Sequence, residues 1–330
     1  MIECLSDSSW INPQIDFLLT LQNLRINHFS MLDDLFLSVT IIGEFWLPTL
    51  ICALVYWCID VKAGLYLTAL SGYNVLFTQL FKMCACVYRP WILSDKIQPV
   101  KKALALAIGY SFPSGHSAQA SSLLGGIAFL ARKKIILSIL LLLLAVFLVG
   151  FSRLWLGVHT PQDVIVGLIT GFTLVFILNF VINWVENNKN RYLYLIAITN
   201  IVIIAILIYL CYFNSYPLDY VNGELLVNPH SSIKSTIWCY GYIGGILNGA
   251  FLCRRFFPFD LSKESTKARI IKAIIGGIGL LLLLKYSTEF LLGDGYRFRV
   301  AFIVPFICGF IITAGYPYIF SKINNYFKSY

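Results

Sequence analysis

Long apolar runs alternate with short polar segments along almost the whole chain. Nine runs are long enough to cross a hydrocarbon core of roughly 30 Å. They fall at about residues 35–58, 62–84, 114–132, 134–153, 161–184, 192–213, 236–256, 268–288 and 298–320. This pattern predicts an all-α fold, namely a polytopic membrane bundle of about nine transmembrane helices.

A further helix is predicted ahead of the first span, in the segment "NPQIDFLLTLQNLR". Asn12 can cap this helix, and Pro13 suits its first helical position. Ile15, Leu18 and Leu19 then share one apolar face. We expect such an amphipathic segment to lie on the membrane surface.

The composition agrees with a membrane protein, because 58% of the residues are hydrophobic and only 12% are charged, with a mean hydropathy of +0.78. The nine cysteines lie mostly inside the apolar runs and form no C-x-x-C pair. This favours packing over a disulfide or metal site. The net charge of +9 comes with no basic stripe interleaved with exposed aromatics, so nucleic acid is not an expected partner.

Lys and Arg are divided unequally between the two sides of the predicted bundle. If nine spans alternate, fourteen basic residues fall on one side and eleven on the other, and most acidic residues accompany the eleven. The positive-inside rule makes the side with fourteen cytoplasmic, where anionic lipid attracts basic residues. Three polar clusters then fall together at the outer face.

The first cluster is "KMCACVYRP", at the outer end of the second span. Lys82 and Arg89 are seven residues apart, which is two helical turns, so both point to one side if the helix continues to the residue before Pro90. Taken alone, the pair is better explained by two basic side chains that snorkel from a span end.

The second cluster is "SFPSGHS", at the start of the third span. Pro113 and Gly115 predict a turn whose backbone N–H groups, next to a helix N-terminus, suit an anion. Ser114 adds a hydroxyl and His116 stands beside it. The alternative is an ordinary helix start with an incidental histidine.

The third cluster, "FSRLWLGVHTPQDVIVG", places charges between two apolar runs, where they are costly unless functional. Thr160 as cap, Pro161 at the first helical position and Asp163 as capping acid explain the carboxylate. They do not explain Arg153 or His159. Because His159 and Asp163 are four residues apart, the carboxylate can hold one imidazole nitrogen.

Together, the clusters bring three cations, one helix N-terminus, two histidines and one carboxylate to the same membrane face. Arg binds phosphate through its planar fork, and Lys acts as a point charge. This combination predicts a phosphate site.

The clusters closely resemble the three-part signature of the type 2 phosphatidic acid phosphatase (PAP2) superfamily. That signature reads Lys, six residues, Arg-Pro; then Pro-Ser-Gly-His; then Ser-Arg, five residues, His, three residues, Asp. The eleven positions are filled by Lys82, Arg89, Pro90, Pro113, Ser114, Gly115, His116, Ser152, Arg153, His159 and Asp163. The nine-span layout is similar to the sphingosine-phosphate phosphatase and glucose-6-phosphatase branches, and also to bacterial members.

The resemblance implies a role for each signature residue. His159 would be the nucleophile that forms a phosphohistidine, with Asp163 fixing its tautomer, and His116 would be the general acid and base. The implied phosphate ligands are Lys82, Arg89, Ser114, Gly115 and Arg153, supported by Pro90, Pro113 and Ser152. No metal or other cofactor is expected, because three cations supply the positive charge and a single carboxylate is too few for a hard-cation cage.

The resemblance also implies a function and a domain organisation. We expect an interfacial helix at 1–34, a PAP2-type catalytic core at 35–184 and a four-helix transmembrane extension at 185–330. The expected enzyme is a metal-independent membrane phosphatase that hydrolyses a lipid phosphate or diphosphate, of phosphatidate, prenyl or sphingoid type, at the outer membrane face. Its partners would be this substrate and membrane lipids.

Two other functions remain open. The same phosphohistidine can pass its phosphoryl group to another lipid, which would make the protein a phosphotransferase, or the fold can bind or transport lipid phosphates without catalysis. The site would face the periplasm or exterior in a bacterial inner membrane, and the lumen in the endoplasmic reticulum of a eukaryote. Glu44, inside the first span, is a further candidate that either pairs with a site cation or stays protonated among the helices.

Overall fold

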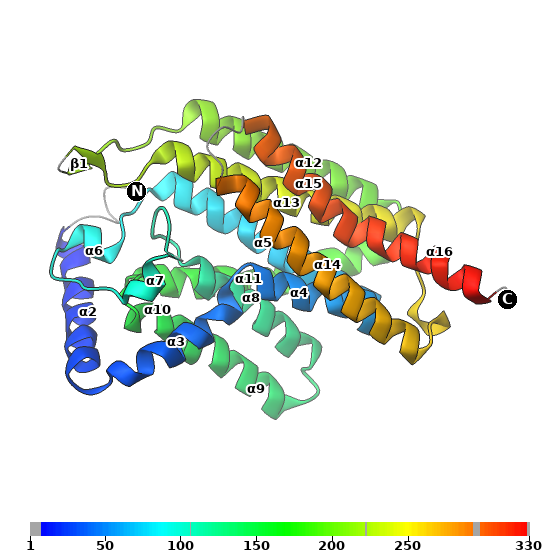
Figure 1. The fold of residues 1–330 in the computed structure, drawn as a ribbon, viewed down its shortest axis with the longest axis horizontal. Helices are drawn as coiled ribbons and strands as arrows, with labels where there is room; N and C mark the ends of the chain where they lie inside the picture. The colour runs from blue at the N-terminus through cyan, green and yellow to red at the C-terminus, as the bar shows by residue number, and fades with distance from the viewer. Residues whose placement is uncertain (1–7, 106, 222, 293–297, 329–330) are drawn as a thin grey trace. The chain divides into compact units, whose positions relative to one another are not determined.

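The structure is a computed structural model that describes residues 8–105, 107–221, 223–292 and 298–328. Helices make up nearly all of it, and the only strands in these residues are the short pair β1 (Tyr220–Val221) and β2 (Glu224–Leu225). The predicted all-α class is confirmed (Figure 1). The chain divides into two compact units, the first comprising residues 1–45, 77–175 and 209–233, and the second 46–76, 176–208 and 234–330.

The first unit contains all three polar clusters. Its elements are α2 (Ser8–His28), η1 (Ser30–Leu32), α3 (Asp33–Thr40), η2 (Ile41–Gly43), the end of α5 (Val61–Ala85), α6 (Pro90–Leu93), α7 (Lys101–Leu104), α8 (Gly115–Leu130), α9 (Ile135–Leu143), η4 (Leu144–Gly150), α10 (Phe151–Trp155), the first part of α11 (Pro161–Glu186), η5 (Tyr209–Phe213), both strands and the start of α13 (Pro229–Phe256). Trp155, Leu156 and Val158 pack with Phe36 in one core cluster. This packing fixes α10 and the segment that leads to α11.

The second unit contains most of the predicted C-terminal extension, while residues 209–233 belong to the first. Its elements are α4 (Trp46–Leu54), η3 (Val55–Ile59), the rest of α5, α11 and α13, α12 (Arg191–Ile208), η6 (Leu261–Lys263), α14 (Thr266–Leu292), α15 (Phe298–Phe310), η7 (Ile311–Gly315) and α16 (Tyr316–Lys328). Helices α13 and α15 approach very closely, because a Cβ added at Gly245 would lie 1.9 Å from the carbonyl oxygen of Phe306. Small residues permit such contacts between membrane helices.

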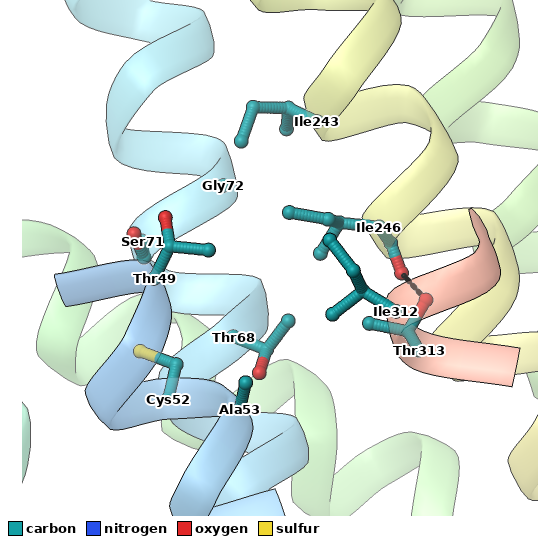
Figure 2. A pocket seen from close by; sticks show the side chains of 10 residues that line it. All are labelled: Thr49, Cys52, Ala53, Thr68, Ser71, Gly72, Ile243, Ile246, Ile312 and Thr313. Atoms are coloured by element: carbon teal, nitrogen blue, oxygen red, sulfur yellow. Dashed lines mark hydrogen bonds between the residues drawn. The ribbon is translucent and has the colours of Figure 1, made fainter. Parts of the chain in front are cut away.

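The second unit also encloses a small cavity of about 20 Å³ (Figure 2). Thr49, Thr68 and Ser71 line one side of it, and Ile243, Ile246 and Ile312 line the other. A cavity of this size holds about one water molecule. It is far too small for the chain of a lipid.

The predicted count of nine spans is not confirmed. In the described part of the chain, four helices are long and apolar enough to cross a membrane, namely Ile135–Trp155, Pro161–Glu186, Arg191–Phe213 and Val300–Lys322. The count becomes five if Ser30–Gly43 and Trp46–Ile59 form one broken span. Helix α8 has only 16 residues, fewer than the roughly 20 that a span needs, and α5 carries polar residues such as Asn74 and Gln79.

The N-terminal helix is present, but two details of its prediction are wrong. Helix α2 begins at Ser8, so Pro13 lies inside the helix and Asn12 does not cap it. Ile15 and Leu18 are buried in a protein core with Ile97, so this face does not lie against lipid. Phe17 and Leu24 are more than 40% exposed on the same helix. Its position on the membrane surface stays a prediction that would rest on those residues.

Candidate active site

Helix α8 begins where the sequence predicts the third span to start, and Ser114 is its N-cap. The Ser114 hydroxyl oxygen accepts hydrogen bonds from the Ser117 backbone N–H at 3.4 Å and from the Ser117 hydroxyl at 2.9 Å. Gly115 and His116 form the first turn, where backbone N–H groups lack helical partners. The turn therefore offers an anion-binding helix N-terminus.

Helix α11 begins at Pro161, also as predicted, but its cap differs from the expected one. The backbone N–H of Thr160 donates to Oδ2 of Asp163 at 2.8 Å, whereas the Thr160 hydroxyl is buried with no partner among the described residues. Asp163 is therefore the capping side chain. The Ser114 N–H also donates to the Asp163 carbonyl oxygen at 2.8 Å, which joins the starts of α8 and α11.

These two helix starts meet because glycines line the contact. A Cβ added at Gly167 on α11 would lie 2.6 Å from the carbonyl oxygen of Ser114, so a larger residue would push the helices apart. Gly43 likewise lets η2 approach the start of α8, since a Cβ added at Gly43 would lie 2.5 Å from the His116 carbonyl oxygen. Close backbone approach thus sets the positions of both histidine-bearing segments.

The imidazole of His159 has a partner at each ring nitrogen. Nδ1 lies 3.3 Å from Oδ2 of Asp163 and 3.2 Å from the hydroxyl of Ser111, and Nε2 lies 2.9 Å from a terminal nitrogen of Arg89. A guanidinium can only donate, so Nε2 is the acceptor and Nδ1 carries the proton. The expected contact between His159 and Asp163 is present in the structure.

Arg89 is fixed by three backbone carbonyls as well as by His159. Its guanidinium donates to the carbonyl oxygens of Gly109, Val158 and Ile108 at 3.0 to 3.1 Å. The side chain is only 4% exposed. It does not snorkel toward water, which removes the alternative reading of the first cluster for this residue.

Lys82 also points into the protein, although the helix that carries it ends earlier than predicted. Helix α5 stops at Ala85, and Cys86 follows with a positive φ of 50°, a conformation typical of a helix end. The chain from Cys86 to Arg89 is not helical. The Lys82 ammonium still donates to the carbonyl oxygens of Tyr110 and Ser111 at 3.0 and 3.2 Å, so Lys82 and Arg89 converge on the same loop.

Arg153 is the third cation, and part of its guanidinium is unpaired. One terminal nitrogen donates to the Thr40 hydroxyl at 2.6 Å. Its Nε and its other terminal nitrogen are buried without a partner among the described residues, and the side chain is 1% exposed. Glu44 is close enough for its charge to act on this guanidinium, and its pairing with a site cation stays a prediction. Unpaired buried donors are costly, and a phosphate oxygen would satisfy them.

His116 faces the same group of charges. Its Nε2 is buried and has no partner among the described residues. The ring feels the charges of Arg153, Arg89 and Lys82. No carboxylate in the described part of the chain bonds to His116 as Asp163 does to His159, which leaves His116 suited to exchange protons with a bound molecule.

Burial sets the protonation of the two site groups that lie between the membrane-spanning segments. Desolvation, and then the positive charges of Arg89, Lys82 and Arg153, hold the pKa of His159 well below its ordinary value. The imidazole is therefore neutral near pH 7, as a nucleophile must be. Desolvation lowers the pKa of Arg89 to about 10, against the attraction of Asp163, so its guanidinium stays charged at neutral pH.

Comparison with known proteins agrees with this geometry. The PAP2 superfamily model matches residues 61–190, and the model of the "PAP2 superfamily phosphatase, transmembrane extension" matches residues 238–327. The chain belongs to the PAP2 superfamily. It is a membrane phosphatase, and the family resemblance found in the sequence is confirmed.

A curated PAP2-type relative was also found. The chain is 29% identical over 158 residues to phosphatidylglycerophosphatase B of Bacillus subtilis, and the match covers 44% of this chain and 72% of the relative. No solved structure matches the chain significantly.

The remaining PAP2 signature residues act through the backbone in the structure. Pro90 occupies the first turn of α6, and Pro113 precedes the Ser114 cap. The Ser152 hydroxyl donates to the carbonyl oxygen of Val149 at 2.7 Å, within its own helical segment. None of these three residues contributes a described contact to the two histidines, and their supporting role stays a prediction.

Sequence analysis missed Ser111 and Thr40 as site residues. Ser111 stands in the quoted cluster "SFPSGHS", but a lone serine before a phenylalanine carries no distinctive signal. Thr40 lies in another predicted span, and only the fold brings it to Arg153. In the described part of the chain, no group of three His, Cys, Asp or Glu side chains gathers in a way that could hold a metal ion.

Proposed function

We propose that this PAP2 phosphatase hydrolyses a lipid phosphate or diphosphate through a phosphohistidine intermediate on His159. The observation that carries the proposal is the two-sided hold on the imidazole, with the Nδ1 proton directed at Asp163 and Ser111 and the Nε2 lone pair directed at the cation cluster. This is the arrangement that a histidine nucleophile needs.

In the first step, the Nε2 lone pair of His159 attacks phosphorus, and the bond from phosphorus to the lipid oxygen breaks. His116 gives its proton to the departing oxygen. Arg89 donates to Nε2 in the structure, so this hydrogen bond must pass to a phosphate oxygen before attack. Lys82, Arg153, Ser114 and the Gly115 N–H hold the other oxygens, where negative charge lies in the transition state.

In the second step, His116 takes a proton from water, and the water oxygen attacks phosphorus. The bond between phosphorus and Nε2 breaks, inorganic phosphate leaves, and the imidazole of His159 becomes neutral again. Asp163 stabilises the positive charge that the ring carries while it is phosphorylated. Each electron pair and proton returns to its starting place after one turnover.

The substrate class follows from the membrane setting and from the relative. Lipid phosphates of phosphatidate, prenyl and sphingoid type all present a terminal phosphate at a membrane face. The relative is named for phosphatidylglycerophosphate, and we therefore place that lipid first among the candidates. Purified protein should release inorganic phosphate from at least one lipid of this panel. Transfer of the phosphate to a second lipid, with none released, would instead favour a phosphotransferase, and no reaction at all would favour a binder.

We expect activity to survive EDTA and to be blocked by vanadate. The proposed site obtains its positive charge from Lys82, Arg89 and Arg153, so chelation should remove nothing that the reaction uses. Vanadate forms a trigonal bipyramid that imitates phosphorus bonded to Nε2 of His159. Phosphate release with and without each reagent checks both points, and an absolute requirement for Mg²⁺ would refute this mechanism.

The proposed orientation puts the active site at the outer face, in the periplasm or exterior of a bacterial cell or in the lumen of the endoplasmic reticulum. Lys189 and Ser215 flank the apolar helix Arg191–Phe213 and are both exposed. In a cysteine-free background, Ser215→Cys should be labelled from outside by an impermeant thiol reagent, and Lys189→Cys only after permeabilisation. The reverse pattern of labelling would overturn the orientation.

A further inference from the structure

Ser111 is completely buried and touches both members of the pair that the proposed mechanism uses for nucleophilic attack. Its hydroxyl donates to Oδ2 of Asp163 at 2.6 Å and lies 3.2 Å from Nδ1 of His159. We propose that Ser111 is a positioning residue, whose hydroxyl is fixed by Asp163 and in turn orients the His159 imidazole. This inference rests on the proposed role of His159 as nucleophile.

The distances favour the hydroxyl over the direct contact as the link between the two residues. The direct distance from His159 Nδ1 to Asp163 Oδ2 is 3.3 Å, which is long for a hydrogen bond that involves a carboxylate. The bond from Ser111 to the carboxylate is 0.7 Å shorter than this, since it measures 2.6 Å. The strongest hydrogen bond of the carboxylate therefore goes to the serine.

The chemistry of the groups fixes the direction of each hydrogen bond. An ionised carboxylate only accepts, so the single proton of the Ser111 hydroxyl must point at Asp163. The hydroxyl then faces His159 with a lone pair, which can only accept the proton on Nδ1. The serine thus selects the tautomer with the proton on Nδ1, which leaves Nε2 free for phosphorus.

The backbone of Ser111 is held on both sides, which keeps the hydroxyl in place. Its N–H donates to the carbonyl oxygen of Val87 at 2.7 Å, and its own carbonyl oxygen accepts from the Lys82 ammonium at 3.2 Å. The Asp163 oxygen that it binds is itself fixed by the N–H of Thr160. Ser111 therefore connects the Lys82 segment, the start of α11 and the nucleophile through one residue.

A purely structural serine and a positioning serine predict different kinetics. If the hydroxyl only fills a buried hydrogen bond, its loss should lower stability and leave turnover of the folded enzyme unchanged. If it orients the imidazole, its loss should lower kcat with little effect on KM, because the phosphate ligands Arg153 and Ser114 are untouched. Loss of the hydroxyl should also weaken inhibition by vanadate more than inhibition by inorganic phosphate. Vanadate binding needs a well-placed Nε2, whereas phosphate binding does not.

The test compares Ser111→Ala and Ser111→Cys with the control Ser122→Ala. The control serine is equally buried, and its hydroxyl only donates to a carbonyl oxygen of its own helix. The alanine variant lacks the hydroxyl, and the cysteine variant keeps the side-chain volume with a much weaker donor. The readouts are kcat, KM and the inhibition constants of vanadate and inorganic phosphate. They are measured on protein whose folded state has been verified by gel filtration and thermal unfolding.

We expect both Ser111 variants to lose about 10- to 100-fold in kcat, the effect of one hydrogen bond to a charged group. The ratio of the vanadate to the phosphate inhibition constant should rise by a similar factor, and Ser122→Ala should match the wild type in both respects. A folded Ser111→Ala or Ser111→Cys enzyme with wild-type kcat and ratio would overturn the inference alone. A wild-type enzyme that forms no phosphoenzyme would overturn the proposed function instead.

Discussion

Replacement of His159 by Asn is expected to abolish measurable turnover, lowering kcat by about 10⁶-fold, the loss that follows removal of the nucleophile in a serine protease. Asn matches the half of the imidazole that carries Nδ1, so its amide N–H can still reach Ser111 and Asp163. No atom takes the place of Nε2, which is the atom proposed to bond to phosphorus. The fold and the cation cluster should therefore survive while the chemistry stops.

Trapping of the phosphoenzyme checks this result more directly than turnover does. Wild-type protein mixed with labelled substrate and quenched in alkali should carry acid-labile label, and the His159→Asn variant should carry none. The same substitution at His116 should slow both formation and hydrolysis of the phosphoenzyme, because His116 is proposed to protonate the leaving group and to activate water, so label should still appear but more slowly than in the wild type. His28 is exposed on α2 and outside the site, so His28→Asn should behave as wild type. Equal labelling of the His159→Asn variant would show that another residue is the nucleophile.

The parts of the site that could be predicted from sequence are those encoded locally. The start of α8 after Pro113 and the start of α11 at Pro161 depend on a few adjacent residues, so the sequence indicates both correctly. The contact of His159 with Asp163 is also local, since His159 lies just before α11 and Asp163 lies in the first turn of that helix. The gathering of three distant clusters was inferred from their shared membrane face and from the PAP2 signature.

The parts that could not be predicted depend on tertiary contacts. The sequence "CVYRP" has no glycine to mark the end of α5, yet Cys86 adopts a positive φ there and the chain turns toward the 108–111 loop. Ser111 gains its importance only because that loop brings it to His159 and Asp163. The buried face of α2 was misread as facing lipid, because an apolar stripe does not reveal whether protein or membrane covers it.

The count of spans was uncertain for a related reason. Residues that serve the site shorten or interrupt the apolar runs on which hydropathy depends. The first turn of α8 forms part of the proposed phosphate site, and the helix has 16 residues in all. A functional helix in the interior of a membrane protein can thus fail a test of length and hydropathy that lipid-facing helices such as α12 pass.

Asp163 has two roles in the structure, and its replacement by Asn separates them. Oδ2 caps α11 by accepting the N–H of Thr160, and it also accepts from Ser111 and contacts His159. An Asn oxygen in the same place can still accept from Thr160 and Ser111, so the cap should cost only a few tenths to about 1 kcal/mol of stability. Asp260 caps η6 through the Ser262 N–H, and Asp260→Asn therefore measures the cost of the same change outside the active site.

The catalytic role of Asp163 does not survive this substitution, because it depends on charge. Asn cannot neutralise the positive ring of a phosphorylated His159, and its NH₂ group can favour the wrong tautomer of the imidazole. Loss of the equivalent carboxylate in a serine protease costs about 10⁴-fold in kcat. We therefore expect Asp163→Asn to insert and fold normally and to lose at least roughly 10²-fold in kcat, the lower range for general acid–base partners. If thermal unfolding shows a folded Asp163→Asn enzyme that turns over like Asp260→Asn, then Asp163 is only a helix cap and the His159 imidazole is oriented by other groups.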